Sequence, residues 1–352
     1  MQPEIHKKAF LNSINYFRGI AIFLIVLGHC FALSRWEISS PAAQFFHAIT
    51  LNGSVYFVFI SGFLYHHVFY HRFDWLKFIT KKIKYVLLPY LFFSTLPIIY
   101  EIYFNGGGEY LPEALKDKHL LGAVWYFLTG RISYAYWYIP MAMLLFAISP
   151  LINWIIIKKQ VLFASLSLLA ISVLIHRPID NINPVHSLIY YLPVYLIGIY
   201  SSLNQSKIYA YLKNNYKKAA LVSIALGLGI IQIFFFQELG NFHKEFWSVT
   251  VPDVNLIQKI LFCFLFISIL DRYENNNISI AKKTAETSFA IYFIHPFLIN
   301  ILISLSHRLN INYEGNILIL ILCALTVTLI SMAIAYCFKA TFKKNSRYLI
   351  GW

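Results

Sequence analysis

Ten apolar segments, each close to the length needed to cross a lipid bilayer, follow one another along this sequence. A membrane helix needs about 20 predominantly apolar residues to span the hydrocarbon core. Only 12% of the residues are charged, whereas soluble proteins have about 25%. The sequence therefore predicts an all-α, multi-pass membrane protein whose single membrane-embedded domain covers residues 1–352. The expected spans are residues 13–33, 52–71, 84–104, 136–157, 160–176, 187–203, 218–238, 255–271, 284–306 and 316–338.

Lysines and arginines are distributed unevenly over the segments that connect these spans. If the N-terminus is cytoplasmic, the connections on that side carry 20 of the 29 basic residues, and the opposite side carries 8. Cytoplasmic loops of membrane proteins show such an excess. We therefore expect about ten transmembrane helices in the bilayer, with both termini in the cytoplasm. The same clustering explains the net charge of +14 better than binding to nucleic acid does.

Two ionisable residues lie within the first span, Arg18 near its start and His29 near its end. They are eleven residues apart, so both side chains project from one helix face, with an axial rise of about 16 Å between them. Ionisable groups are costly in hydrocarbon and usually face a protein interior or a watery cavity. Arg18 alone could reach the headgroups, and His29 alone could bond to a neighbouring helix. Because they share a face, we expect a functional site along it.

Three further stretches carry candidate residues. Ser61 and Gly62 form a pair of small residues, which lets a second helix approach closely. The basic linker 77–89 either meets anionic lipid or binds the phosphates of a soluble donor. In the ninth span His295 is followed by a proline, which would free a backbone carbonyl. The four cysteines have no metal-ligand spacing, so no metal is expected.

The first span, the span with Ser61 and Gly62, the basic linker and the ninth span follow one another as in the acyltransferase-3 family, which the sequence resembles. That family consists of integral-membrane O-acyltransferases with ten membrane helices that act on glycans and related acceptors. The resemblance covers the whole chain and matches the form without a fused hydrolase-like domain. Where the family usually has arginines in the basic linker, this sequence has lysines, which keep the charge but lose the bidentate geometry. The matching motifs are R-G-I-A-I-x-L-I-V-L-G-H at 18–29, F-x-x-x-S-G-F-L at 57–64, L-P-Y at 88–90, Y-W-Y-I-P at 136–140 and I-Y-F-I-H-P at 291–296.

The resemblance implies transfer of an acyl group, commonly acetyl, from cytoplasmic acyl-CoA at the bacterial cytoplasmic (inner) membrane. The acceptor would be a hydroxyl of a cell-envelope or exported glycan, or of a lipid-linked saccharide. Glu286 is near the cytoplasmic end of its span and is assigned to the donor end. The anionic part of acetyl-CoA would meet the basic side chains at that end, which are Arg18, Lys81, Lys82 and Lys84.

For the reaction itself, His29 is either the general base toward the acceptor hydroxyl or a brief carrier of the acyl group. Glu101, at a comparable predicted depth, is the candidate to orient His29. His295 either polarises the thioester carbonyl or only holds helices together. Aromatic residues at the external side could stack on a sugar, although a membrane-interface belt explains them more simply. They are Trp125, Tyr126, Tyr134, Tyr136 and Trp137.

The competing hypothesis is a transporter or flippase that moves a lipid-linked glycan without acyl transfer. It would use the same polar face, but the paired repeats of many transporters are not found in this sequence. The external segments 105–135 and 237–255 are expected to choose the acceptor. No motif names the acceptor glycan or distinguishes an acetyl from a succinyl donor.

Overall fold

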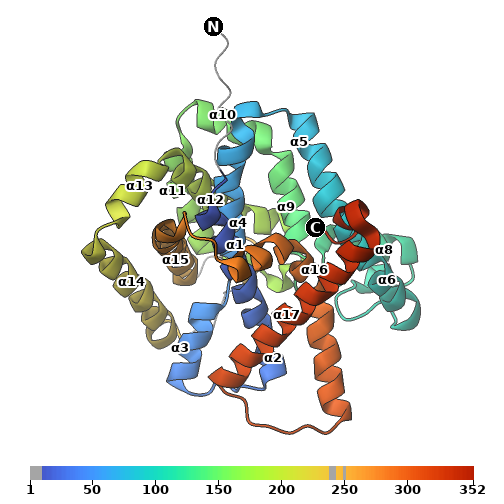
Figure 1. Ribbon diagram of the computed structural model, residues 1–352. Coiled ribbons are helices and arrows are strands. Elements are labelled where there is room, and N and C mark those ends of the chain that lie inside the picture. Colours follow the sequence, from blue (N-terminus) through green and yellow to red (C-terminus); the bar gives the residue numbers. More distant parts are fainter. Residues whose placement is uncertain (1–9, 238–242, 249–250) are drawn as a thin grey trace.

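A computed structural model describes residues 10–237, 243–248 and 251–352. Residues 1–9 and part of the predicted acceptor segment 237–255 lie outside the described residues. The described chain is a bundle of helices (Figure 1) with two short strands, each of two residues. The strands β1 (Arg177–Pro178) and β2 (His243–Lys244) pair in parallel, with Arg177 opposite His243. The prediction of an all-α fold is therefore confirmed, apart from this small pairing.

Each of the ten predicted spans coincides with a helix or with consecutive helices. Among the described residues, six helices are long and apolar enough to cross a membrane on their own, or seven if α9 and α10, bent by 53°, form one span. The count of ten spans and the cytoplasmic termini therefore remain predictions. The helices that coincide with the ten predicted spans are α1 (Asn12–His29), α4 (Ser54–Leu64), α6 (Leu88–Phe104), α9 (Tyr138–Ala147), α10 (Ser149–Ile157), α11 (Val161–Ile175), α12 (Pro184–Leu203), α14 (Asn215–Ile230), α15 (Val254–Leu270), α16 (Ser279–Arg308) and α17 (Ile317–Phe342).

The helices α1 and α12 fall outside those six, and both are enclosed by other helices. Helix α1 contacts α4, α15, α16 and α17, and it passes through the middle of the bundle in Figure 1. Helix α12 contacts α4, α9 and α11 and carries several fully buried tyrosines. A helix surrounded by protein need not present apolar side chains to lipid on every face. Their lower apolarity therefore fits an inner position.

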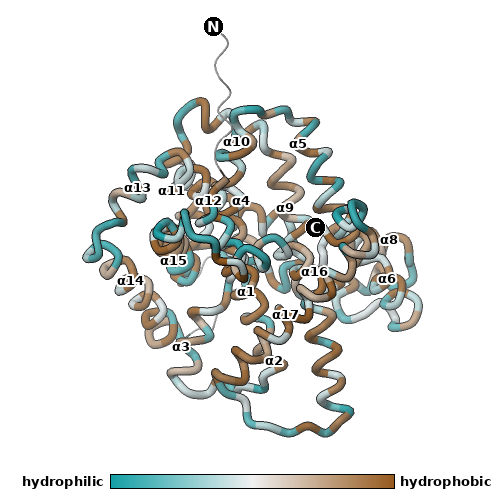
Figure 2. Tube along the Cα trace, in the orientation of Figure 1, coloured by the Kyte–Doolittle hydropathy of each residue, from teal (hydrophilic) through white to brown (hydrophobic). Residues whose placement is uncertain are grey.

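Large apolar side chains are exposed on the outer helices. Leu96 of α6, Phe163 of α11 and Leu318 of α17 are 75%, 74% and 68% exposed. Figure 2 shows hydrophobic residues along outer helices such as α14 and α17, and hydrophilic residues at helix ends and in connecting segments. Exposed apolar surface on this scale is costly in water but not in lipid. The protein is therefore a multi-pass membrane protein.

Helices α4 and α12 cross closely. A Cβ atom built on Gly62 would lie 2.0 Å from the carbonyl oxygen of Tyr195. Only glycine permits that approach without moving the backbone of one helix. The prediction that Ser61 and Gly62 allow close packing is confirmed for Gly62. The crossing also fixes the position of α4 in the bundle.

Shorter helices connect the spans. They are α2 (Phe31–Ser34), α3 (Pro41–Thr50), α5 (Trp75–Lys82), α7 (Glu113–Lys116), α8 (His119–Thr129), α13 (Gln205–Leu212) and α18 (Ser346–Leu349). Helix α5 continues into α6 through a π-helical turn, Ile83–Leu87, so the basic linker is helical throughout its length. The 105–135 segment, expected as an external loop, contains α7 and α8.

Candidate active site

Helix α1 is fixed at its start by a carboxylate from a distant part of the chain. The backbone N–H groups of Asn12 and Ser13 donate to the two carboxylate oxygens of Glu274, at 2.7 and 2.8 Å. A negative charge at this position satisfies free N–H groups and interacts favourably with the helix dipole. About two turns further on, a Cβ atom on Gly19 would lie 2.8 Å from the carbonyl oxygen of Ala281. The absence of a side chain at Gly19 therefore lets α1 lie directly against α16.

One cavity, of about 240 Å³, follows the face of α1 that carries Arg18 and His29. Both of these side chains line it, together with residues of α4, the end of α5, α9 and α16. We call its two ends the Arg18 end and the His29 end. The expectation that the two residues act along one face thus corresponds to a real space in the molecule.

The Arg18 end of the cavity contains two basic side chains. The Arg18 guanidinium donates to the Asn15 side chain at 3.0 Å, but its Nε is buried without a hydrogen-bond partner. Glu286 is near enough to act on Arg18 electrostatically, although Glu286 itself is exposed and does not line the cavity. The Lys82 ammonium lines the cavity and lies 4.3 Å from the ring centroid of Phe146. This end can therefore receive an anion.

The lysines of the basic linker project in different directions from their helix, and only one of them reaches the cavity. Asp74 caps the start of α5 by accepting from the Lys77 N–H, and its bond from the Lys77 ammonium holds the pKa of Asp74 below its ordinary value. From this cap α5 runs to Lys82, which reaches the cavity, whereas Lys81 and Lys84 are exposed. Successive helical residues are about 100° apart, so the three side chains cannot all reach one space. Of the three lysines assigned to the donor, only Lys82 lines the cavity.

At the His29 end, three polar rings meet. The ring centroid of His29 lies 4.7 Å from that of Tyr134 and 5.4 Å from that of His295. The Nδ1 of His295 is 3.0 Å from the carbonyl oxygen of Ile291, so Nδ1 carries the hydrogen and donates. The Nε2 of neutral His295 is then an acceptor, and it is buried without a partner, as is the Tyr134 hydroxyl. Two unused polar atoms therefore adjoin His29.

The segment that carries Tyr134 is attached to α16 by two tyrosine hydroxyls. Tyr136 donates to the carbonyl oxygen of Phe293 at 2.7 Å, and Tyr292 donates to that of Ala135 at 2.5 Å. These reciprocal bonds place Tyr134 and the cavity-lining Trp137 in a fixed relation to His295. The sequence analysis considered Tyr134 as a sugar-stacking or membrane-interface aromatic and did not place it beside His29, although the motif that begins two residues later marked the segment. The aromatic ring facing His29 was therefore missed.

Comparison with known protein families identifies the family of this chain. The family described as an acyltransferase domain (Acyl_transf_3) matches residues 11–336. The chain belongs to the acyltransferase-3 family. No curated protein and no solved structure matches the chain significantly. The family match spans nearly all of the sequence, including α1, the basic linker and His295, so the protein is a membrane acyltransferase and the cavity is its candidate active site.

In this acyltransferase, Glu101 lies apart from His29. Its carboxylate accepts from the Asn105 side chain at 2.7 Å, and a Cβ atom on Gly108 would lie 2.7 Å from it. Glu101 is not among the described residues that line the cavity. A similar depth in the membrane does not fix which face of a helix a residue occupies, and Glu101 faces the turn after α6. We therefore do not retain it as the partner that orients His29.

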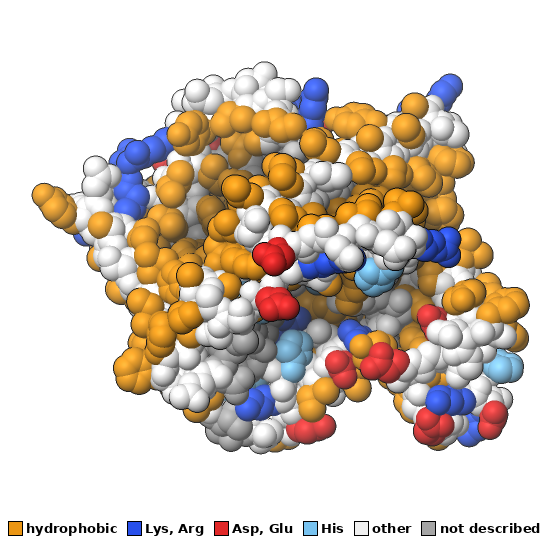
Figure 3. Space-filling model, turned by 90° about the horizontal axis from the view of Figure 1, so that it is seen from below, with side chains coloured by type: hydrophobic (Ala, Val, Ile, Leu, Met, Phe, Trp, Pro, Cys, Tyr) orange, Lys and Arg blue, Asp and Glu red, His pale blue; other side chains and the backbone are white. Residues whose placement is uncertain are grey.

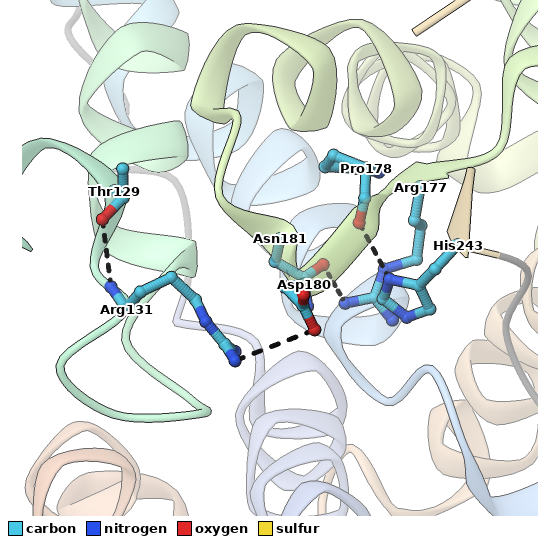
Figure 4. A network of polar contacts seen from close by, with 7 residues as sticks. All are labelled: Thr129, Arg131, Arg177, Pro178, Asp180, Asn181 and His243. Carbon is cyan, nitrogen blue, oxygen red and sulfur yellow. Dashed lines mark hydrogen bonds and ion pairs between the residues drawn. The ribbon is translucent and has the colours of Figure 1, made fainter. Parts of the chain in front are cut away.

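A second polar cluster of the acyltransferase lies beyond Trp137, and the sequence did not identify it. Arg177 lies over the Trp137 ring, 4.8 Å from its centroid, and Arg131 comes from the segment between α8 and α9. Figure 4 shows both arginines directed toward the turn that contains Asp180 and Asn181. Figure 3 shows charged and histidine side chains around a hollow on the face seen from below. Both arginines were counted only as external charges.

Proposed function

We propose that this acyltransferase takes an acyl group, acetyl in the simplest case, from cytoplasmic acyl-CoA and transfers it to a hydroxyl of a cell-envelope glycan. The observation that carries the proposal is that one and the same cavity has basic groups at one end and His29 at the other. The axial rise of about 16 Å between Arg18 and His29 is similar to the reach of an extended pantetheine arm. The enzyme would act in the bacterial inner membrane, with the Arg18 end toward the cytoplasm.

The donor would bind at the Arg18 end through charge. The Arg18 guanidinium and the Lys82 ammonium would contact the CoA phosphates, and the unpaired Nε of Arg18 is one available donor. The exposed Lys81 and Lys84 would raise the local concentration of the anionic donor without holding it. The thioester would then lie near His29, where the cavity walls are mostly aromatic and apolar.

The acyl transfer would proceed with His29 as general base. His29 takes the proton of the acceptor hydroxyl, and the oxygen attacks the thioester carbonyl carbon. The carbon–sulfur bond breaks, and the CoA thiolate leaves with the proton that His29 returns. An alternative order forms an acyl–His29 intermediate first, followed by attack of the hydroxyl on it. Direct transfer needs one fewer intermediate and is preferred here.

The neighbours of His29 would divide the remaining tasks. Because neutral His295 has no hydrogen on Nε2, it would accept a bond from a His29 N–H and leave the other His29 nitrogen free for the hydroxyl. This positioning role is proposed in addition to the two roles considered from the sequence, polarising the thioester carbonyl and holding helices together. The buried Tyr134 hydroxyl is unpaired and would donate to the oxygen that becomes negative during attack.

The test is acyl transfer in sealed membrane vesicles with the cytoplasmic face outward. Acetyl-CoA labelled in its acetyl group is supplied to wild type, His29→Ala and the control His47→Ala, whose histidine lies on α3 and does not line the cavity. We expect label in glycan for wild type and control, and a loss of about 10²–10⁴-fold in His29→Ala. Normal transfer by stably inserted His29→Ala would reject His29 as the base. No label from any acyl-CoA, with glycan export intact, would instead favour a transporter.

A further inference from the structure

Arg131 and Arg177 are almost fully buried, with 8% and 5% of their surfaces exposed. They come from different parts of the chain, Arg131 from the α8–α9 connection and Arg177 from β1. Both have an aromatic ring below the guanidinium, since Arg131 lies 3.7 Å from the centroid of Tyr110 and Arg177 lies 4.8 Å from that of Trp137. Such stacking holds an arginine in place but leaves its in-plane N–H donors available.

One tight turn faces both guanidiniums. Asp180 and Asn181 are adjacent and both have positive φ angles, +50° and +55°, a conformation that aspartate and asparagine adopt more readily than most residues. Asn181 accepts a hydrogen bond from Arg177 at 2.8 Å, and Asp180 lies 3.9 Å from Arg131. The turn therefore lies between the two arginines (Figure 4).

Among the described residues, neither guanidinium of this cluster forms a hydrogen-bonded ion pair. The 3.9 Å separation between Arg131 and Asp180 is too long for a hydrogen bond, and Asp180 is half exposed. Asp253, a carboxylate that acts on Arg177 electrostatically, accepts from the Tyr190 hydroxyl at 2.7 Å and from the Leu256 N–H at 3.1 Å. Within the described part of the chain, the Nε atoms of Arg131 and Arg177 are both buried without partners.

Buried guanidiniums with unused donors are costly unless an anion completes them. This cluster adjoins the His29 end of the cavity, because Trp137 lines the cavity and also stacks with Arg177. The donor phosphates have a separate pair of cations at the Arg18 end. An anion bound at the arginine cluster would therefore belong to the second substrate.

We propose that Arg131 and Arg177 bind a carboxylate or phosphate group of the acceptor, which is accordingly an acidic saccharide. Each guanidinium donates to the anion, with Asp180 moving aside, and the anion anchors the sugar while one of its hydroxyls reaches His29. The assignment of the anion to the acceptor rests on the proposed function, because only an acyl transfer defines donor and acceptor ends.

The test measures binding without acyl-CoA, so that it does not depend on catalysis. The purified full chain in lipid nanodiscs is titrated calorimetrically with methyl β-glucuronide and with methyl β-glucoside, which differ in the carboxylate. Glucose 6-phosphate and inorganic phosphate form two further arms. The variants are Arg131→Met, Arg177→Met, the donor-end Lys82→Met, and the control Arg308→Met, an exposed arginine at the end of α16.

We expect the glucuronide or the sugar phosphate to bind at least about tenfold more tightly than the glucoside. Arg131→Met and Arg177→Met should lose that preference, and Lys82→Met and Arg308→Met should keep it. Equal binding of charged and neutral sugars, no binding of any sugar, or inorganic phosphate binding as tightly as the sugars would overturn the proposal. So would loss of the preference in Lys82→Met. Equal wild-type binding of charged and neutral sugars overturns the proposal even if an arginine variant fails to fold, and retention of the preference in folded Arg131→Met and Arg177→Met overturns it too. Failure of acyl transfer in vesicles leaves the binding result intact.

Discussion

At the scale of single residues, the lysines of the basic linker show how neighbouring charges acquire different roles. Lys82 ends α5 and reaches the cavity, with its ammonium above the Phe146 ring. Lys81 and Lys84 have the same charge but are exposed. A charge bordering a low-dielectric cavity acts more strongly on a bound anion than one surrounded by water. The linker therefore contains one binding lysine and two that contribute to the general field.

Replacing Lys82 by methionine keeps the length of the side chain and removes the charge. We expect the KM for acetyl-CoA to rise about tenfold or more, because one charge-assisted contact to a phosphate is lost. The matched variant Lys81→Met should change KM by less than about twofold at physiological ionic strength, where exposed charges are screened. Initial rates at varied acetyl-CoA concentration measure both values. Equal effects of the two variants would contradict a specific role for Lys82.

The same scale shows which site residues the sequence could reveal. Arg18 and His29 belong to one helix, so their spacing alone places them on one face. Tyr134, Arg131 and Arg177 come from connecting segments, whose positions depend on tertiary contacts such as the Tyr136 bond to α16. A sequence pattern contains no period in such segments, and these three residues could not be assigned from it.

At the scale of elements, the crossing of α4 and α12 places one wall of the cavity. Ser61 lines the cavity, and its neighbour Gly62 touches the backbone of α12. The close approach was predictable, because two small residues in an aromatic span are typical of a helix interface. The identity of the partner helix was not, since no local feature of α4 indicates α12.

Gly62→Ala should destabilise the protein by about 2 kcal/mol or more, because the added methyl group would lie 2.0 Å from the Tyr195 carbonyl oxygen. The matched variant is Gly227→Ala in α14, where a Cβ atom has no neighbour within 4 Å. That change should be neutral or stabilise the protein by up to about 1 kcal/mol, since alanine favours a helix. Thermal unfolding in detergent compares the two. An unchanged melting temperature for Gly62→Ala would show that the helices separate easily.

Lys259 of α15 illustrates a charged residue whose role was not evident from the sequence, where it was counted among the external charges. It is fully buried, and its ammonium donates to the carbonyl oxygens of Ala48 and Ile49, at 2.8 and 2.5 Å. These carbonyls lie in the last turn of α3, where helical C=O groups lack partners within the helix. The lysine therefore joins two elements, and counting it with the charges of the external side and its helix ends did not reveal this role.

At the scale of the whole molecule, the inner helices α1 and α12 fall short of the hydropathy that outer helices such as α6 and α17 reach. The outer helices α6 and α17 expose apolar side chains, whereas α1 and α12 are enclosed and carry the polar groups. Mean hydropathy reports how favourably a segment's side chains transfer into lipid. It is therefore lower for inner helices, whose polar side chains contact protein. Helix α11 is a different case, because it is apolar but has only 15 residues. Its length of about 22 Å is shorter than a hydrocarbon core of about 30 Å.

The count of ten spans requires α11 to cross the membrane. If α11 crosses, Lys158 before it lies in the cytoplasm and Ile182 after it lies outside, next to the arginine cluster. We expect a membrane-impermeant maleimide to label Ile182→Cys in intact spheroplasts and Lys158→Cys only after permeabilisation. The experiment uses a background in which Cys323 and Cys337, the two native cysteines that are not buried, are replaced by serine. Labelling of both positions from one side would mean that α11 does not cross, and the proposed external position of Arg131 and Arg177 would then need revision.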